Sequence, residues 1–419
     1  MMRRKPYLRS FASLVALAGL AITPVAALSE PAVTGAPTLA KSAGAPPAAR
    51  PMTRAEILLL AEKVADHQIA MLAAGQVHPR NAADSTDPRG WVQGAFFIGL
   101  MHLADRSQSP QYRDFLMARG ESNRWELGRR LYHADDHAVG QAYLWASRHG
   151  AGPEALAPMR KAFDLILANP PHADFAFIER PAGAGDPLCF DRWCWCDALF
   201  MSPPAFIELS QVTGDPRYTA FAKAEFWAAT DYLLDTDSGL YFRDSRFFDR
   251  RGENGEKIFW SRGNGWVFAG LANILTHLPK ADPDRAKFEA LFKTMAARLI
   301  SVQKPDGYWN SSLLGDPKGS LPESSGTGFF VYGLAWGIEN GLLDPAAYGP
   351  HVDLGWQALT RSVHDNGKLG WVQPISDRPE LNTFDDSQIY GVGAFLLAAT
   401  AVADLQEKPG AQPKTRRKR

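Results

Sequence analysis

The chain has 419 residues, and its 45 Lys and Arg balance its 45 Asp and Glu, so the formal net charge is zero. This balance argues against a main role in nucleic-acid binding, which depends on a basic excess gathered on one face. Hydrophobic residues make up 46% and charged residues 21%, as in soluble globular proteins, which excludes disorder over most of the length. The 12 Trp fit a large core and surfaces on which sugars stack.

The first 27 residues have the pattern of an export signal. Basic residues precede a short apolar run over 11–22, and residues 25–27 have the small-x-small form that signal peptidase accepts. We therefore expect cleavage near Ala27 and a mature protein that is periplasmic or secreted. No later segment is long and apolar enough to span a membrane. The rest is predicted to divide into a linker (28–52), one catalytic domain (53–405) and a basic flexible tail (406–419).

Two kinds of segment alternate along the domain. One kind carries charges and has apolar residues three and four apart, which predicts amphipathic helices over 53–74, 111–119, 153–167, 215–234, 283–303 and 345–363. The other kind is rich in Gly, Ala and aromatic residues, which predicts buried helices over 91–103, 136–147, 197–209, 264–278, 325–339 and 388–403.

This alternation predicts an all-α fold, an (α/α)6 barrel of six helical hairpins with the apolar helices inside. Glycines inside the apolar helices cost about 1 kcal/mol each, so we expect them to permit close approach of neighbouring helices. These glycines are Gly99, Gly140, Gly270, Gly333 and Gly393. The segment 239–259 is the best candidate for a β-hairpin or a long loop.

Polar and aromatic residues gather at the starts of the apolar helices. They lie at Trp91 and in the segments 135–137, 193–197, 260–266, 323–325 and 385–387. In a ring of helical hairpins, the starts of all inner helices face the same end. We therefore expect these six separate segments to build one cavity.

Two of these segments carry carboxylates suited to acid–base chemistry. Asp197 follows two Trp, whose indoles would desolvate the carboxyl, raise its pKa and make it a usable general acid. Asp136 has a like-charged neighbour in Asp135 and is followed by His137. Each carboxylate could instead cap a helix, because Asp is a favoured N-cap residue.

Arg262 lies between Trp260 and Trp266 in a Gly-rich stretch. The glycines would let the backbone approach a ligand, the guanidinium can hold a carboxylate bidentately, and the indoles can stack on a sugar ring. A Gly-rich turn with core tryptophans is the alternative. More arginines lie in neighbouring loops, at Arg180, Arg192, Arg243 and Arg246. Together these residues suggest an anionic sugar substrate.

Three cysteines lie within eight residues, at Cys189, Cys194 and Cys196. In an oxidising compartment one pair could form a disulfide and leave one thiol free. No further Cys or His follows at zinc-ligand spacing, which argues against a metal site.

The sequence resembles the unsaturated glucuronyl and rhamnogalacturonyl hydrolases, glycoside hydrolase families 88 and 105, and family 105 more closely. The resemblance covers residues 53–404. It rests on 132–141 (YHADDHAVGQ), 191–201 (DRWCWCDALFM), 260–266 (WSRGNGW) and 325–330 (SGTGFF).

The resemblance implies an enzyme without metal or cofactor that removes a 4,5-unsaturated uronic acid from the non-reducing end of lyase-generated oligosaccharides, with pectin or rhamnogalacturonan as the expected source. Such enzymes hydrate the double bond. Asp197 then corresponds to the acid/base and Asp136 to the assisting carboxylate, with Asp135 as the second candidate for that role. Arg243 stands where some members have a His. Substrate contacts are expected from Trp91, His137, Trp195, Arg243, Trp260, Arg262 and Trp266.

Two other functions fit the same residues. An inverting glycosidase could use Asp197 as acid and a second carboxylate as base on saturated acidic oligosaccharides. A non-catalytic carbohydrate-binding protein could use the Trp-lined cavity alone, although it would not need a desolvated carboxyl. We expect an oligosaccharide as the partner, no nucleic acid, no membrane span, and a monomer or weak dimer.

Overall fold

The computed structural model describes residues 50–76, 85–181, 185–316 and 320–407. The predicted signal peptide, all but the last residues of the predicted linker, and the predicted tail from residue 408 lie outside the described residues. Within them, no helix is long and apolar enough to cross a membrane.

Twelve segments of the described chain form the two layers expected from the sequence. The inner helices are α3 (Trp91–Ala104), α5 (Ala138–Ala146), α7 (Ala198–Met201) with α8 (Pro203–Thr213), α10 (Ser261–His277), α12 (Ser324–Glu339) and α14 (Ile389–Leu405). The outer helices are α1 (Arg54–Ala73), α4 (Gln111–Ser122), α6 (Ala157–Ala168), α9 (Pro216–Leu233), α11 (Arg285–Ser301) and α13 (Pro345–Arg361). Short helical turns are η2 (Ala134–His137), η3 (Ser147–Ala151), η4 (Pro153–Leu156), η5 (Leu188–Arg192) and η6 (Ser245–Phe247).

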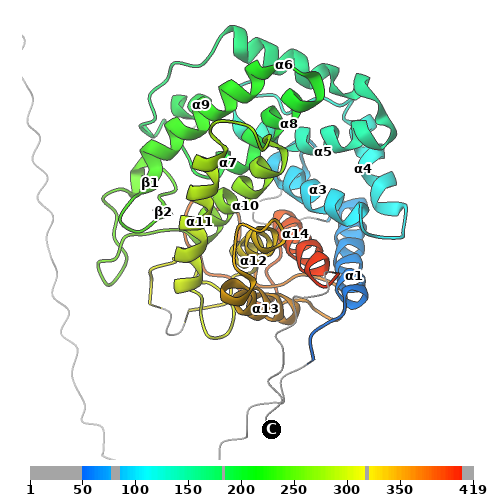
Figure 1. Cartoon of the computed structure of the whole chain (residues 1–419), viewed down its shortest axis with the longest axis vertical. Helices are drawn as coiled ribbons and strands as arrows, with labels where there is room; N and C mark the ends of the chain where they lie inside the picture. The colour runs from blue at the N-terminus through cyan, green and yellow to red at the C-terminus, as the bar shows by residue number, and fades with distance from the viewer. Residues whose placement is uncertain (1–49, 77–84, 182–184, 317–319, 408–419) are drawn as a thin grey trace, which may run out of the picture. The chain divides into compact units, whose positions relative to one another are not determined.

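The inner helices close into a ring. Contacts run from α3 to α5, from α5 to α8, and onward through α10, α12 and α14 back to α3. Outer helices pack against this ring, as α13 does against α12 in Figure 1. The predicted all-α fold, an (α/α)6 barrel, is confirmed. One predicted inner helix, 197–209, is divided in two at Ser202, because two consecutive prolines follow and proline cannot donate the next helical hydrogen bonds.

Glycines set the spacing of the inner ring. A Cβ atom at Gly99 would overlap the backbone of Gly393, and one at Gly393 would overlap the carbonyl group of Ala95. Helices α3 and α14 therefore touch backbone to backbone where the ring closes. A Cβ atom at Gly270 would likewise meet the carbonyl of Leu199, in α7. The expected role of these glycines in close helix packing is confirmed.

We expect Gly393→Ala to lower the free energy of unfolding by about 1–3 kcal/mol, because overpacking a buried contact forces neighbouring backbone apart. The matched control is Gly349→Ala in the outer helix α13, where an added Cβ meets nothing within 4 Å apart from its neighbours in the chain and the helix backbone. That control should cost less stability than Gly393→Ala, since the added Cβ meets only the adjacent Pro350 ring, which disfavours a helical backbone at the preceding residue. Chemical denaturation of both variants measures the difference. Equal stability of the two would contradict the packing argument.

Few of the described residues form β-strands. β1 (Leu234–Asp235) pairs antiparallel with β2 (Leu240–Tyr241), with Leu234 opposite Tyr241. A separate antiparallel bridge joins Arg251 to Lys257. The predicted hairpin over 239–259 is thus a short β-pair that begins earlier than expected and continues into a long loop. This loop matters because it carries Arg243 and Asp244 to the mouth of the barrel.

Candidate active site

Two cavities adjoin at the end of the barrel where the inner helices begin. We call them the inner and the outer cavity, with volumes of about 390 Å³ and 660 Å³. Trp91 and Asp135 line both. The inner cavity is otherwise lined by Trp195, Asp197, Met201, Arg243, Trp260, Ile375, Ser376 and Asp377. The outer cavity is otherwise lined by Thr86, Asp87, Pro88, Gly90, Arg129, Arg130, His133, Asp136 and Phe190.

The segment before α7 delivers Asp197 to the inner cavity. A disulfide joins Cys189 to Cys194, and Trp193 adopts the left-handed backbone region with φ 56°. That region is unfavourable for a bulky residue. The Trp193 indole is fully buried against Phe206 and Phe221, which holds the tight turn in place. Asp197 makes no side-chain hydrogen bond that caps α7, so its carboxyl is available to a ligand.

Burial and nearby polar groups pull the pKa of Asp197 in opposite directions. Desolvation raises it above its ordinary value, and the guanidinium groups of Arg243 and Arg262 oppose this rise. Arg243 Nε lies 3.6 Å from Asp197 Oδ2, and the Cys196 thiol donates to the same oxygen over 3.4 Å. The net result is a carboxyl that holds its proton to higher pH than a solvent-exposed Asp, as general acid catalysis requires.

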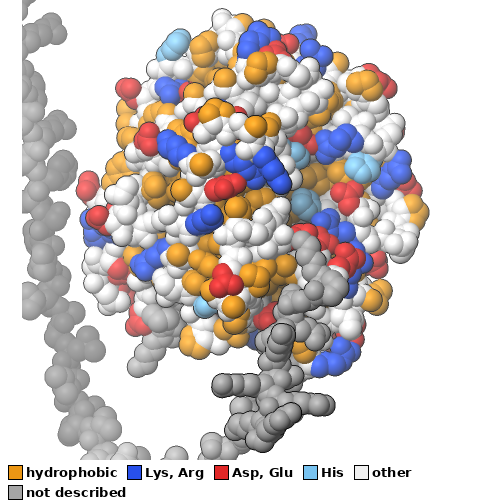
Figure 2. Space-filling view, in the orientation of Figure 1, with side chains coloured by type: hydrophobic (Ala, Val, Ile, Leu, Met, Phe, Trp, Pro, Cys, Tyr) orange, Lys and Arg blue, Asp and Glu red, His pale blue; other side chains and the backbone are white. Residues whose placement is uncertain are grey.

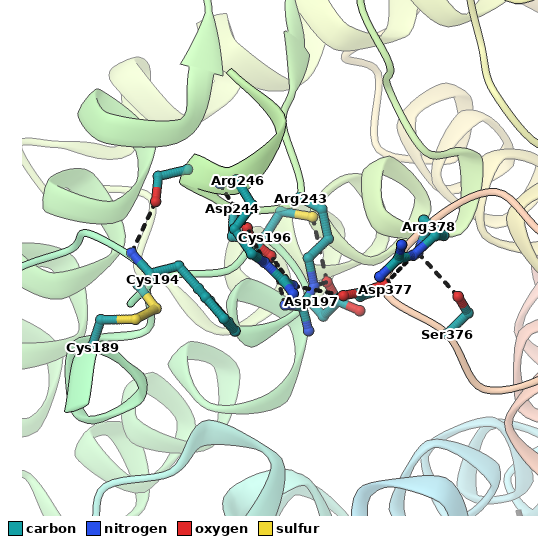
Figure 3. Close-up of polar contacts among 12 residues, drawn as sticks. Cys189, Cys194, Cys196, Asp197, Arg243, Asp244, Arg246, Ser376, Asp377 and Arg378 are labelled. Atoms are coloured by element: carbon teal, nitrogen blue, oxygen red, sulfur yellow. Dashed lines mark hydrogen bonds and ion pairs between the residues drawn. A yellow bond between two sulfur atoms is a disulfide. The ribbon is translucent and has the colours of Figure 1, made fainter. Parts of the chain in front are cut away.

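A network of charged side chains forms one wall of the inner cavity (Figure 3). Asp244 is fully buried and accepts from Arg243 and Arg246, each over 2.8 Å. Arg246 also pairs with Asp377 over 2.6 Å, and Arg378 donates to the other oxygen of Asp377. These arginines lower the pKa of Asp377, whose carboxylate therefore stays ionised at the cavity wall. The network connects the loop after β2 to the segment before α14.

The paired carboxylates at η2 have different surroundings. Asp136 is buried, and Arg130 donates to it from its backbone N–H over 2.7 Å and from its guanidinium over 2.6 Å and 3.1 Å. Arg130 also pairs with Asp186. Asp135 lines both cavities, and it forms no ion pair with an arginine among the described residues. Its burial raises its pKa to about 7, against an opposing effect of the Arg130 charge and with a further rise from the charge of Asp197. The geometry therefore favours Asp135 as the partner of Asp197, whereas Asp136 is engaged by Arg130.

Arg262 lies behind the inner cavity rather than in its lining. It is almost completely buried, and it packs on the rings of Trp260 and Tyr390. Its guanidinium donates to the carbonyl of Pro374 over 2.8 Å and to that of Gln373 over 3.5 Å. These bonds engage Nη1 and Nη2, and the remaining Nε is buried, so the guanidinium offers no accessible pair of donors to a substrate carboxylate. Arg243 is instead the arginine that the structure brings to the lining of the inner cavity.

Gln373 anchors the segment of the chain that lines the inner cavity together with Trp260. Its fully buried amide oxygen accepts from the indole N–H of Trp260 over 3.0 Å, and its amide nitrogen donates to Ser311 and to the carbonyl of Glu380. The next residues, 375–377, line the inner cavity. One buried amide thus positions both an aromatic side chain of the site and the segment facing it.

The other predicted site residues divide into two groups. Trp91, Trp195 and Trp260 line the inner cavity. Trp266 and His137 line neither cavity: Trp266 is fully buried against aromatic neighbours, and the His137 imidazole bonds to Ser202 Oγ and the Leu131 carbonyl. Glu323, in another of the segments expected at the cavity, caps α12 instead.

Sequence reasoning missed the wall residues Ile375, Ser376 and Asp377, and it missed Arg129 of the outer cavity. No motif distinguishes these residues, because they lie in irregular segments between helices.

The free cysteine, Cys196, is buried. In the part of the chain that the structure describes, no group of three or more His, Cys, Asp or Glu side chains is arranged to hold a metal ion.

Sequence comparison adds independent information. The family model described as Glycosyl Hydrolase Family 88 matches residues 60–406. The chain is 42% identical over 347 residues to the unsaturated 3S-rhamnoglycuronyl hydrolase of Alteromonas sp. (strain LOR), which covers 81% of this chain and 84% of that protein. It is 37% identical over 343 residues to a protein of the same name from Formosa agariphila, with 79% and 88% covered.

Solved structures of other proteins have a fold similar to this barrel. A glycosyl hydrolase family 88 protein from Bacteroides vulgatus is similar with a TM-score of 0.73 at 26% identity, over 84% of this chain and 99% of that one. A possible member of family 105 from Salmonella enterica is similar with a TM-score of 0.67 at 18% identity, over 86% and 96%, and supports the fold alone. The resemblance to these hydrolases that the motifs suggested is confirmed.

Proposed function

Because the chain belongs to glycosyl hydrolase family 88 and is an unsaturated uronyl hydrolase, we propose that it releases an unsaturated uronic acid from a rhamnose that carries a sulfate group. The sugar class is supported by the name that the two relatives share, unsaturated 3S-rhamnoglycuronyl hydrolase, in which 3S denotes a 3-sulfate. The observation that carries the chemistry is the pair Asp135 and Asp197, two desolvated carboxyls that line one Trp-walled cavity.

The proposed reaction is hydration of the C4–C5 double bond. Asp197 transfers its proton to C4, and the ring oxygen stabilises the positive charge that develops at C5. A water molecule then adds at C5 and loses a proton to the carboxylate pair, which restores the starting state. The resulting hemiketal opens, C5 becomes a ketone, and the former ring oxygen on C1 expels the rhamnose. One acid/base group can therefore serve both proton transfers.

The lining of the inner cavity supports this assignment. Arg243 supplies a positive charge near Asp197, where the uronate carboxylate needs a cation. Trp195 and Trp260 supply apolar walls that exclude water from the carboxyls. A carboxyl kept protonated near neutral pH is of little use to a protein that only binds sugars, so catalysis is favoured over simple binding.

A panel of lyase-generated disaccharides tests the substrate. It contains an unsaturated uronyl unit linked to rhamnose with a 3-sulfate, the same compound without sulfate, and a rhamnogalacturonan-derived disaccharide. We expect loss of absorbance of the conjugated double bond to be fastest with the sulfated compound. A saturated analogue should not react, because it has no double bond to hydrate. Cleavage of the saturated analogue would instead indicate an ordinary inverting glycosidase.

We also propose that the protein is exported and acts as a monomer or weak dimer in the periplasm or outside the cell. The basic n-region, the short apolar run and the small residues at 25–27 support export. Mass spectrometry of the protein recovered from its native host should show a new N-terminus near Leu28. Recovery of protein that retains Met1 would contradict export by cleavage.

A further inference from the structure

The outer cavity contains a cation that the proposed reaction does not use. Arg129 lies in its lining, and its side chain is exposed. No hydrogen bond or ion pair of its guanidinium is found among the described residues. We propose that Arg129 binds the sulfate of the leaving sugar. This inference rests on the proposed function, because it requires that the outer cavity receives the sugar released from the uronic acid.

The placement of the two cavities leads to this assignment. Asp197 and Arg243 line only the inner cavity, so the unsaturated uronyl unit belongs there. The outer cavity meets the inner one at Trp91 and Asp135, which line both. A sugar joined to the uronyl unit by one glycosidic bond extends past these two residues. The outer cavity, with about 660 Å³, has room for that sugar and its substituents.

The other basic groups of the outer cavity are already engaged or neutral. Arg130 pairs with both Asp136 and Asp186. Burial lowers the pKa of His133 well below its ordinary value, so its imidazole is neutral at pH 7. Within the lining described for this cavity, Arg129 is therefore the cation whose charge is not compensated by a neighbouring carboxylate.

The charge of the lining makes such a cation necessary for a sulfated substrate. The carboxylates Asp87, Asp135 and Asp136 all line the outer cavity and would repel a sulfate. Arg130 compensates Asp136, and Asp135 keeps a proton up to a pH of about 7 because burial raises its pKa. A guanidinium presents paired N–H donors that match the geometry of sulfate oxygens. Arg129 can thus convert a repulsive cavity into one that selects the anion.

The test compares Arg129→Gln with the wild-type enzyme on the sulfated disaccharide and on its desulfated form. A charge-assisted hydrogen bond in this partly exposed setting corresponds to a factor of about 10 in kcat/KM. We expect the variant to lose about 10-fold on the sulfated compound and less than about twofold on the desulfated one. The matched control is Arg124→Gln, an exposed arginine nearby that lines neither cavity and pairs with Glu126. It should leave both values unchanged.

The possible outcomes separate this inference from the proposed function. If the wild type turns over both compounds equally well and Arg129→Gln changes neither rate, the enzyme hydrates unsaturated uronyl substrates but Arg129 does not bind sulfate. An equal loss on both compounds assigns Arg129 a structural role and also overturns the inference. If the wild type turns over neither compound, the proposed substrate is wrong and the inference fails with it.

Discussion

Asp197→Asn should abolish nearly all turnover while the protein still folds and binds substrate. General acid–base catalysis contributes a factor of about 10² to 10⁴, and here one carboxyl serves two proton transfers, so we expect a loss near the upper end. Asparagine has almost the same shape and still accepts from the Cys196 thiol. Arg243 keeps its pairing with Asp244 in the variant, so no cation is left without a partner.

Single-turnover rates and calorimetric binding of the sulfated disaccharide measure the two effects separately. Asp191→Asn is a suitable control, because Asp191 lies in the same segment, within η5, and lines neither cavity. It should retain the wild-type rate. If Asp197→Asn kept more than about a tenth of the wild-type rate, the acid role would move to another carboxyl, and Asp135 would be the first to test.

Asp135→Asn and Asp136→Asn should have different effects. We expect Asp135→Asn to lower kcat/KM by about 10²-fold, because Asp135 faces the cavity of Asp197 and carries a proton near neutral pH. Asp136→Asn should lower kcat/KM less than about 10-fold. Its main effect should be a stability loss of about 1–3 kcal/mol, because it breaks the buried contacts with Arg130.

The pH profile provides a measurement that a merely structural role would not change. Burial raises the pKa of Asp135 to about 7, so the carboxyl is protonated below that pH and ionised above it. Ionisation of Asp135 would place a negative charge beside Asp197, in the cavity that receives the uronate carboxylate, so kcat/KM of the wild type should fall as pH rises through about 7. Asp136→Asn should keep this alkaline limb, whereas Asp135→Asn should shift or remove it. The reverse result would assign the assisting role to Asp136.

Contacts with the segment 373–377 explain why Arg262, a candidate for binding the substrate carboxylate in the sequence, lies outside the cavity lining in the structure. In the sequence, Arg262 has two indoles and several glycines near it, as a ligand-binding arginine would. In the structure, the segment that occupies its donors comes from more than 100 residues later, at Gln373 and Pro374. No local sequence pattern predicts a contact between residues so far apart in the chain. Arg243, by contrast, lies in an irregular loop, and its place beside Asp197 depends on how that loop folds over α7 and α10.

The sequence by itself determined the barrel, the position of Asp197 and the family. Helical periodicity is a local property, and glycines within buried helices directly predict close helix packing, as Gly99 and Gly393 show. Alternating helices also place the starts of all inner helices at one end, and four of the six expected segments do line the two adjoining cavities, whereas 323–325 and 385–387 line neither. The resemblance added the chemistry, because the motifs around Asp136, Asp197 and Arg262 occur together in these hydrolases.

Only the tertiary structure shows which of the neighbours Asp135 and Asp136 lines the cavity of Asp197. Consecutive residues on a helical turn point in different directions, and which one reaches a cavity depends on partners from elsewhere in the chain. Arg130 engages Asp136, while Asp135 lines the inner cavity together with Trp91 and Asp197. Desolvation and pairing depend on three-dimensional proximity rather than on residue type. For the same reason the basic and acidic side chains that meet near the centre of the face drawn in Figure 2 could not be paired from the sequence.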